Sequence, residues 1–530
     1  MKIKFSRGII RLEFIVKEPG FYPSSEDTVE EAIYIIKDNW NDWFDYQTLY
    51  RVIYKDKNVI KEIGEVKIGE VGMEPDEKQY VSPNLTESFK KLDDQFFSLG
   101  QDVSYYKNLN KLGEDLRFEI LVKLRDVALN NKLFDFFLNE DVMGRSLLRS
   151  VSRLSVRGQF NRLAKGDSSL TPYKFSYLPP DGNSELAFEV KPNSHPPSNV
   201  HVLIGRNGVG KTHMLNNMIK SLVLYDTSDK YGSFYSEIED EQEIFASLVS
   251  ISFSAFDQTK PLPQQKDNSK GIKYSYVGLQ QQLQTDEEII NEETINDKEG
   301  EQHFPKDINM LGDEFSTSLS AVIRASKKTR LIMALRTLEA DPIFKDIGIS
   351  HIVHKKNIRK ARRIFRNLSS GHKIVLLTIT KLVETVEERT LVIIDEPEGH
   401  LHPPLLSAFT RALSNLLKTR NGVGIIATHS PVILQEVPKS CVNIINRRNK
   451  DISINPPEIE TFGENIGTLT REVFGLEVTQ SGFHKLLEEA VEDLEDFDSV
   501  IEHFKDELGM EARGIIRALL LYRDDEGMLD

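Results

Sequence analysis

The sequence is poor in cysteine and has no long apolar run, and each scarcity excludes a class of protein. Cys441 is the single cysteine among 530 residues, which excludes an internal disulfide framework and an all-cysteine zinc or iron–sulfur site within one chain. No stretch reaches the about 18 apolar residues of a membrane helix, and the first residues lack the apolar core of a signal peptide. We therefore expect a cytoplasmic protein in a reducing compartment, with no membrane partner.

The sequence also lacks an excess of basic residues and any strong compositional bias. Lys and Arg number 67 against 82 Asp and Glu, a formal net charge of −15, which argues against a surface that binds nucleic acid all over. Hydrophobic residues make up 39% of the chain and charged residues 28%, as in ordinary folded proteins. A length of 530 residues corresponds to about three to four domains, or to one domain with large insertions.

A glycine-rich loop is the first motif with a chemical meaning. It reads Gly205-Arg206-Asn207-Gly208-Val209-Gly210-Lys211-Thr212, follows the strand-like run Val200–Ile204 and fits G-x-x-x-x-G-K-[ST]. Such loops turn backbone N–H groups towards phosphates, while the lysine reaches the β- and γ-phosphates and the hydroxyl binds Mg²⁺. The pattern predicts an ATP and Mg²⁺ site, and a glycine-rich turn before a buried helix is the alternative. The predicted nucleotide contacts are Arg206, Asn207, Gly208, Val209, Gly210, Lys211, Thr212 and His213, with Thr212 also a metal ligand.

A second motif is an apolar strand that ends in two carboxylates. Leu391–Ile394 runs directly into Asp395 and Glu396, as expected where strand ends deliver side chains to a nucleotide at the edge of a parallel sheet. We expect Asp395 to hold Mg²⁺ and Glu396 to act as the general base on the attacking water. Alone, the pattern is common in surface loops, and its pairing with the glycine-rich loop favours the functional interpretation.

Two shorter motifs complete the set. Leu368-Ser369-Ser370-Gly371-His372 precedes a helical apolar pattern, which predicts a serine N-cap whose free N–H groups suit a γ-phosphate. Ile425–Ser430 is a strand pattern that ends in His429, and a histidine at that sheet edge can contact the γ-phosphate and the water. We therefore add Ser369, Ser370 and Gly371 as nucleotide contacts, and His429 as a catalytic residue beside Glu396.

The order of these four motifs resembles that of ABC-type ATPases, with Leu368–His372 matching the signature motif and His429 the switch histidine. The resemblance implies a two-fold homodimer, or a higher oligomer, in which the glycine-rich loop of one copy and the signature of the other enclose each ATP. It also implies a Q-loop glutamine, for which Gln258 is the candidate and a metal contact. Ser370 replaces the second signature glycine, and Pro397–Pro403 resembles soluble ABC ATPases related to the overcoming-lysogenization-defect nucleases and the chromosome-maintenance group.

The fold class implied is α/β, a P-loop ABC-type ATPase fold with a mixed sheet flanked by helices, a helical insertion and an acidic helical C-terminal tail. Patterning along the chain places five parts in order. They are a mixed α/β portion of the ATPase lobe (1–170), the P-loop segment (171–258), an inserted and partly mobile segment (259–360), the part with the signature, the two carboxylates and the switch histidine (361–478), and the tail (479–530).

Several segments outside the motifs resemble the PtuA ATPases of Septu-type and retron-associated phage defence. They are Asp38–Trp43, Ile63–Gly69, Phe97–Asp102, Ser146–Arg149 and Thr461–Glu464. This resemblance implies an HNH nuclease partner, PtuB, and in some systems a retron reverse transcriptase with its msDNA. In such systems the ATPase scaffolds and restrains the nuclease until infection disturbs the complex.

Two basic stretches stand out against the acidic background. Seven basic residues and no acid occupy 355–366, and Arg145, Arg149, Arg153 and Arg157 recur every four residues, so that a helix would place them on one face. Both stretches suit either a phosphate backbone or an acidic partner chain. They support the alternative function, a stand-alone DNA-maintenance or repair ATPase, against which the lack of long heptad arms counts.

A nuclease site within the chain is not indicated. His400 and His402 beside Glu398 imitate metal-ligand spacing, although a role in the dimer interface suits their position better. Asp496 and Asp498 form a D-x-D pair without a preceding buried strand. We therefore predict an ATPase whose cutting partner is a separate polypeptide; slow hydrolysis, because Ser370 departs from the signature, is a further alternative.

Overall fold

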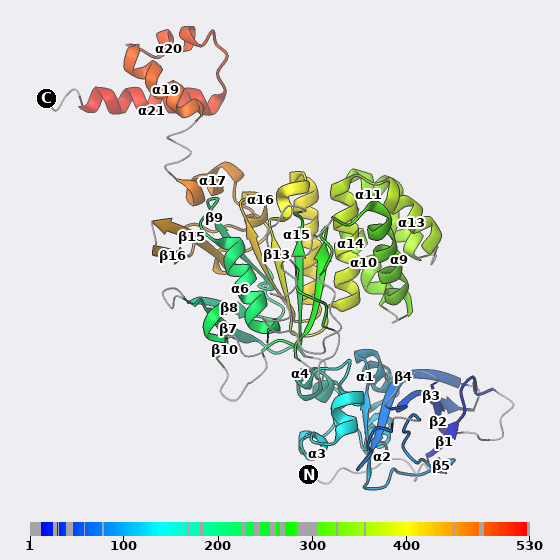
Figure 1. The fold of residues 1–530 in the computed structure, drawn as a ribbon. Coiled ribbons are helices and arrows are strands. Elements are labelled where there is room, and N and C mark those ends of the chain that lie inside the picture. The colour runs from blue at the N-terminus through cyan, green and yellow to red at the C-terminus, as the bar shows by residue number, and fades with distance from the viewer. Residues whose placement is uncertain are drawn as a thin grey trace.

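The structure is a computed structural model, and the residues that it describes form three sheets and many helices (Figure 1). Gln258, Lys355, Lys356 and most of the segment 38–43 lie outside the described residues. No helix in the described part of the chain is long and apolar enough to cross a membrane. The described residues are 12–526 except 25–28, 30, 39–45, 58, 77–78, 168, 181–184, 225–227, 238–243, 255–260, 266–270, 283–304, 325–326, 355–356, 449–450, 476–481 and 495.

The N-terminal portion folds around a sheet and a hydrophobic core of its own. The six-stranded sheet has the order β5-β1-β2-β3-β4-β6, and only the β1–β2 pair is parallel. Helices packed beside this sheet complete the core, which includes Phe97, Tyr106 and Phe137. The elements are β1 (Glu13–Lys17), β2 (Glu31–Lys37), β3 (Leu49–Asp56), β4 (Val59–Glu70), β5 (Ser88–Phe89), β6 (Phe96–Gly100), α1 (Val103–Asn110), α2 (Glu114–Lys123), α3 (Asn131–Phe137), α4 (Arg153–Ser155) and α5 (Asn161–Ala164).

The arginines from Arg145 to Arg157 do not lie along one helix, so that expectation was wrong. A π-helical turn over Met143–Leu147 ends before α4, and a second π-helical turn, Val156–Phe160, separates α4 from α5. A π-turn changes the rotation per residue, so a spacing of four no longer keeps side chains on one face. Two of the four arginines also have carboxylate partners: Arg145 pairs with Asp141 at 3.1 Å and Arg157 with Asp135 at 2.7 Å.

The second half of the chain is built on a seven-stranded sheet of order β12-β11-β13-β14-β9-β15-β16. Neighbouring strands are parallel except for β15 and β16. The central strands β9 and β14 are buried along their whole length, as expected for a parallel sheet covered on both faces. The strands are β9 (Val200–Gly205), β11 (Ser247–Ser252), β12 (Lys273–Gly278), β13 (Thr390–Asp395), β14 (Val423–Thr428), β15 (Val442–Arg448) and β16 (Asp451–Asn455).

Helices cover both faces of this sheet. One face packs against α6 (Lys211–Val223) and the small antiparallel sheet β10-β7-β8, which share one hydrophobic core with it. The other face packs against the larger helical layer (Figure 1). The remaining elements here are β7 (Tyr173–Leu178), β8 (Leu186–Val190), β10 (Ser233–Ser236), α7 (Ser228–Tyr231), α9 (Ile308–Arg324), α10 (Lys328–Leu338), α11 (Pro342–Ile347), α12 (Ile349–His354), α13 (Ile358–Asn367), α14 (Ser370–Thr385), α15 (Pro403–Lys418), α16 (Pro431–Leu434) and α17 (Ile466–Phe474).

The segment 259–360 contributes to the body of this half. Strand β12 joins the edge of the seven-stranded sheet, and apolar residues of α9, α10, α11 and α12 belong to the same core as the central strands. Phe315 of α9 stacks on Phe365 of α13 with 4.7 Å between ring centroids. The helical insertion expected from the sequence is therefore a packed layer over the sheet.

The C-terminal tail forms a small helical unit. Its helices α19 (Phe483–Asp493), α20 (Phe497–His503) and α21 (Met510–Glu526) share a core that includes Leu487, Val500 and Ile516. Figure 1 shows these helices set apart from the seven-stranded sheet. The α/β fold with a helical layer and a helical tail agrees with the fold class expected from the sequence.

Candidate nucleotide site

Three neighbouring parallel strands bring the predicted motifs to one edge of the sheet. Strand β14 lies between β13 and β9, with Asp395 opposite Ala427 and Thr428 opposite Ile204. The carboxyl ends of parallel strands meet at the same edge, where α/β proteins bind ligands. The glycine-rich loop after β9, the carboxylates after β13 and His429 after β14 are therefore neighbours.

The glycine-rich loop has the backbone that phosphate binding requires. Gly208 and Gly210 have φ angles of +78° and +101°, which side chains rarely adopt, and a Cβ at either position would meet nothing within 4 Å. Gly210 is the N-cap of α6 and brings no side chain over the helix N-terminus. Loop and helix thus present N–H groups to open space, as an anion site needs.

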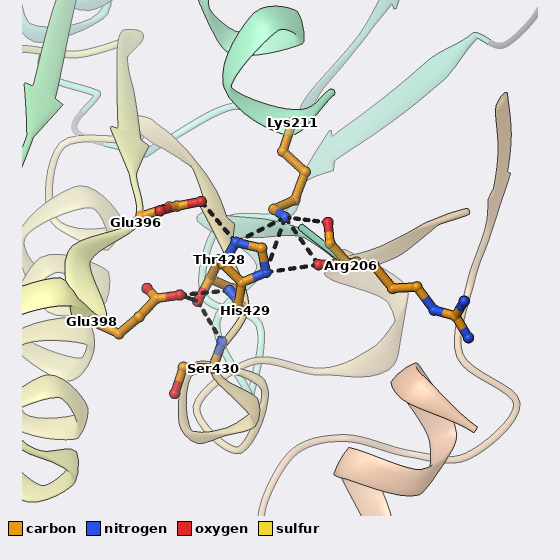
Figure 2. A network of polar contacts seen from close by, with 8 residues as sticks. Arg206, Lys211, Glu396, Glu398, Thr428, His429 and Ser430 are labelled. Carbon is orange, nitrogen blue, oxygen red and sulfur yellow. Dashed lines mark hydrogen bonds and ion pairs between the residues drawn. The ribbon is translucent and has the colours of Figure 1, made fainter. Parts of the chain in front are cut away.

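Lys211 is buried at the centre of the site, and polar groups surround its ammonium (Figure 2). Its Nζ donates to the carbonyl oxygens of Gly205 at 2.9 Å and Arg206 at 3.0 Å, and it lies 3.1 and 3.2 Å from the ring nitrogens of His429. Burial lowers the pKa of Lys211, and the charges of Glu396, Asp395 and Glu398 oppose that shift. The same carboxylates therefore favour the charged ammonium.

Glu396 and His429, the two residues predicted to be catalytic, are in direct contact. The Nε2 atom of His429 lies 2.7 Å from Oε1 of Glu396, and its Nδ1 lies 2.9 Å from the Gly205 carbonyl oxygen. Glu396 has a φ of +43° and is the N-cap of a short 3-10 helix, Pro397–His400. Its amide donates to the Ala427 oxygen at 2.9 Å. Such a strained backbone conformation persists where neighbours hold it, often at functional sites.

Glu398 has a role that the sequence did not reveal. Its Oε1 accepts hydrogen bonds from the Thr428 hydroxyl at 2.8 Å and from the His429 amide at 2.5 Å. The carboxylate thereby fixes the turn that carries the histidine (Figure 2). The repeat Glu396-Pro397-Glu398 was the available signal, because it places a second carboxylate next to the strand end.

Thr212 and Asp395, the two described residues predicted as metal ligands, line the same hollow. The hollow has a volume of about 60 Å³ and lies between α6 and the ends of β11, β12 and β13. A hydroxyl and a carboxylate are the hard oxygen donors that Mg²⁺ prefers, so the residues present fit that ion. Gln280, which follows β12, lines the same hollow and was not among the residues predicted from the sequence, whereas the predicted Q-loop glutamine, Gln258, lies outside the described residues.

The remaining residues predicted from the loop lie at its rim. Val209 is buried, whereas Arg206, Asn207 and His213 are exposed. The Nε2 atom of His213 lies 3.2 Å from the Asn217 amide nitrogen on the same helix. Figure 2 shows the Arg206 side chain pointing away from Glu396, so that its carbonyl rather than its guanidinium takes part in the Lys211 network.

The signature residues form the N-terminus of α14. Ser369 is the N-cap predicted for this helix, and its Oγ accepts from the His372 amide. A Cβ at Gly371 would lie 2.3 Å from the His400 carbonyl oxygen, so this position requires glycine for close packing against Pro397–His400. Among the described residues, no hydrogen bond joins Ser369, Ser370 or Gly371 to the glycine-rich loop of the same chain.

A hydrogen-bonded chain supports Ser369 from behind. Its Oγ lies 2.6 Å from Nδ1 of His372, whose Nε2 lies 3.1 Å from Oδ1 of the buried Asp341. Asp341 caps α11 and lies 3.5 Å from Nε2 of His402, the N-cap of α15. Three helix N-termini are therefore linked by their capping side chains. Sequence reasoning missed Asp341, although an aspartate before Pro342 is a typical N-cap signal.

The same three residues have the composition of a metal site. Ligand atoms of Asp341, His372 and His402 lie within 4.8 Å of one another. However, Nδ1 of His402 accepts from the Leu405 amide at 3.2 Å, which leaves the proton of a neutral ring on Nε2, the atom a metal would need. The positive ends of three helices also disfavour a cation. We therefore interpret the cluster as a hydrogen-bond network.

Known protein families and solved structures can be compared with this chain. A family model described as "AAA domain, putative AbiEii toxin, Type IV TA system" matches residues 230–435. Two solved structures resemble the fold. One is an inward-facing putative metal-chelate type ABC transporter, with 12% identity, a TM-score of 0.29 and coverage of 57% of this chain and 89% of that one. The other is the ADP conformation of an ATP-binding cassette of an ABC transporter, with 13% identity, a TM-score of 0.30 and coverage of 59% and 100%.

TM-scores this low do not assign the chain to a family. A relative found by sequence does. Protein ea59 of Escherichia phage lambda is 37% identical over 544 aligned residues, which cover 97% of this chain and 99% of that protein. Similarity at that level extends over the N-terminal sheet, the P-loop ATPase core and the helical tail alike. Residues 230–435 match an AAA domain model, and the chain as a whole belongs to the family of protein ea59 of phage lambda.

Proposed function

We propose that this chain binds ATP with Mg²⁺ at the edge of the seven-stranded sheet and hydrolyses it. The observation that carries the proposal is the contact network of Lys211, His429 and Glu396 at the ends of three adjacent parallel strands. It combines a cation for the phosphates, a carboxylate for the water and a histidine between them. Such a set serves phosphoryl transfer to water, in which positioning and charge stabilisation provide most of the catalysis.

In the proposed reaction, the N–H groups of Gly208 to Lys211 and the positive end of α6 bind the β- and γ-phosphates. Lys211 turns its ammonium from the carbonyl oxygens of Gly205 and Arg206 to the phosphate oxygens. Mg²⁺, held by Thr212 and Asp395, would neutralise phosphate charge. Glu396 accepts the proton of the attacking water, and His429 orients the carboxylate through its 2.7 Å contact.

The signature residues act in this proposal on the nucleotide of a second copy. Ser369 to Gly371 present the N-terminus of α14, a site for negative charge, and they make no hydrogen bond with their own glycine-rich loop among the described residues. A two-fold dimer satisfies both halves at once. ATP then stabilises the closed dimer, and hydrolysis releases it.

The proposed biological role is control of a separate HNH nuclease of the PtuB type in anti-phage defence. The description of the family model that matches residues 230–435 includes the words "putative AbiEii toxin, Type IV TA system", which supports a role in a two-component module. A relative in a phage genome supports a module that acts between phages and their hosts. The proposal extends to a retron reverse transcriptase and its msDNA as further components.

The chemical part is tested by the Glu396→Gln variant of the full chain. Glutamine keeps the size of the side chain and cannot accept the proton, so hydrolysis should fall by about 10²–10⁴-fold while ATP affinity is kept. Phosphate release and ATP binding by calorimetry measure the two effects. A variant that hydrolyses ATP as fast as the parent would exclude Glu396 as the general base.

The biological part is tested by purification of the tagged chain from its host at physiological salt. Mass spectrometry and nuclease-sensitive gel staining identify what accompanies it. A stoichiometric HNH protein, with or without a reverse transcriptase and small DNA, supports the role. A chain that arrives alone, or with bulk DNA that salt releases, contradicts it.

A further inference from the structure

Helix α13 carries an arginine stripe that neither the proposed reaction nor the core requires. Arg359, Arg362, Arg363 and Arg366 follow one another at intervals of three, one and three residues, the spacing that keeps side chains on one helix face. Together with Asn367 they line an open hollow of about 530 Å³. The chain has a net charge of −15, so this stripe reverses the local sign of the surface.

Packing in the hydrophobic core accounts for the residues on the buried face of α13, but not for the arginines of the stripe. Ala361 and Phe365 are buried, and Phe365 stacks on Phe315 of α9. On the stripe, Arg362 forms an ion pair with Asp313 and Arg366 donates to Asn309. Arg359 and Arg363 are exposed, and among the described residues no carboxylate lies within ion-pair distance of either. Like charges at i,i+4 destabilise an isolated helix, so the stripe is not there for stability.

We propose that the arginine stripe binds the phosphate backbone of a nucleic acid. Guanidinium groups recognise phosphate oxygens through paired N–H donors. The distance between Arg359 and Arg366 along the helix axis is about 10 Å at 1.5 Å per residue, which equals the axial rise of about three base pairs of a duplex at 3.4 Å each. The hollow therefore has the length, charge and donor chemistry of a backbone site.

The lining of the hollow favours nucleic acid over an acidic protein. Arginine and asparagine side chains form it, without an apolar or aromatic residue. Protein interfaces need a buried apolar centre, whereas interfaces with nucleic acid are polar and strongly basic. Without aromatic side chains the hollow offers no base stacking, and contacts to phosphates carry no sequence information. The site binds nucleic acid without sequence preference.

The position of the stripe links it to the nucleotide site, a step that rests on the proposed function. Helix α13 ends at Asn367, its C-cap is the buried Leu368, and the next residue is Ser369, the N-cap of α14. A displacement of α13 therefore moves the signature residues. If ATP changes the affinity for nucleic acid, nucleic acid must change the affinity for ATP by the same factor.

The test uses the full chain and a labelled 30-base-pair duplex of random sequence, with the single strand and the matching RNA as further probes. Fluorescence anisotropy gives the affinity over a range of salt concentrations, without nucleotide and with ATP or ADP. The variant is Arg359→Ala with Arg363→Ala, because both side chains are exposed and outside the core. The matched control is Arg153→Ala with Lys165→Ala, two exposed basic residues of the other basic stretch.

We expect the α13 variant to lose about tenfold or more in affinity at moderate salt, and its plot of log affinity against log salt to become shallower by about 2. Arg359→Lys with Arg363→Lys should keep most of the slope, because the charge remains. An unchanged affinity and slope, a larger loss in the control variant, or a parent that binds none of the three probes would each overturn the proposal. Binding without nucleotide tests the stripe alone, and the response to ATP tests the link to the proposed function.

Discussion

The N-terminal sheet and the seven-stranded sheet differ in where their interacting polar groups lie. In the N-terminal half, Asp126 is buried and accepts hydrogen bonds from the Tyr106 hydroxyl and from the Gly100 and Ala128 amides. In the other half, Glu396 and His429 lie partly exposed at the edge of the sheet. A mostly antiparallel sheet does not gather the carboxyl ends of its strands at one edge, whereas neighbouring parallel strands do. Chemistry is therefore expected on one half only.

Substitution of Lys211 is expected to give the largest effect, and it should affect only the site on the seven-stranded sheet. Lys211→Ala removes the charge that faces the phosphates, and a charge-assisted hydrogen bond contributes about 1.5–3 kcal/mol, so two or more such bonds correspond to an ATP affinity at least about 100-fold weaker. The fold should survive, because the ammonium is itself destabilised by burial. Calorimetric titration with ATP measures the loss, and thermal unfolding monitors the fold. A variant that binds ATP as tightly as the parent contradicts the site.

Local motifs were predictable from the sequence, and contacts between distant residues were not. The glycine-rich loop, the strand that ends at Asp395 and the Ser369 cap each depend on fewer than ten neighbouring residues, and all three have the predicted local structure. Asp341 reaches His372 across 31 positions, and Gln280 lines the same hollow as Thr212 only because β12 joins the sheet. No local pattern encodes such pairings.

In the N-terminal portion, too, the sequence pattern did not predict the structure that packing produces. The spacing of the four arginines depends on a rotation of about 100° per residue, and the π-helical turns Met143–Leu147 and Val156–Phe160 change that rotation. The turns bury Leu147, Val156 and Phe160 in the N-terminal core. Packing of the core therefore overrides the regular helix that the sequence pattern favours.

Asp341 belongs to a polar network with His372 and His402. This network lies in the same part of the chain as the candidate nucleotide site, so it tests that part separately from the N-terminal sheet. Asp341→Ala removes the cap of α11, worth about 1 kcal/mol, and leaves the buried His372 without its partner, at a cost of about 1–3 kcal/mol. Asp341→Asn keeps the cap and serves as the matched control. We expect the free energy of unfolding to fall by about 2–4 kcal/mol for alanine and clearly less for asparagine.

The rate of ATP hydrolysis reports whether Asp341 positions Ser369 through His372, which a measurement of stability alone does not. Because His372 loses its orientation and with it the Ser369 hydroxyl, kcat should fall in Asp341→Ala, while the affinity of the chain for ATP stays near that of the parent. Asp341→Asn keeps the Oδ1 that contacts His372, so its kcat should stay near that of the parent. Denaturant unfolding, phosphate release and calorimetry provide the three values. Loss of ATP affinity together with stability would indicate a general packing defect instead.

Asp126 tests the N-terminal half by itself. Burial raises the pKa of Asp126 to about 7, although the hydrogen bonds to it act in the opposite direction. The folded state keeps the proton that the unfolded chain loses above its ordinary pKa of 3.8. The contribution of Asp126 to stability is therefore fully present below pH 3.8 and is lost as pH rises through about 7.

The matching variant, Asp126→Asn, does not titrate. It should be destabilised by about 1–3 kcal/mol at low pH, because its amide NH₂ faces backbone donors, and the deficit should shrink as the pH approaches 7. Scanning calorimetry of parent and variant from pH 4 to 7 measures the difference. ATP binding should not change, and a deficit that grows with pH would reverse the assigned sign.

His201, on the strand that leads to the glycine-rich loop, changes stability with pH in the direction opposite to Asp126. Its ring is buried, with the Phe188 ring edge-on at 5.2 Å, and burial lowers the pKa of His201 from 6.5 to about 4. The unfolded chain takes up a proton below pH 6.5 that the folded chain refuses until about pH 4. Stability is thus present above pH 6.5 and is lost as the pH falls, by roughly 3 kcal/mol at most. His201→Phe should remove this loss of stability, and Asp126→Asn should leave it intact. Calorimetry of both variants at pH 5 and 7 separates the two contributions, because acid lowers the contribution of His201 to stability and raises that of Asp126.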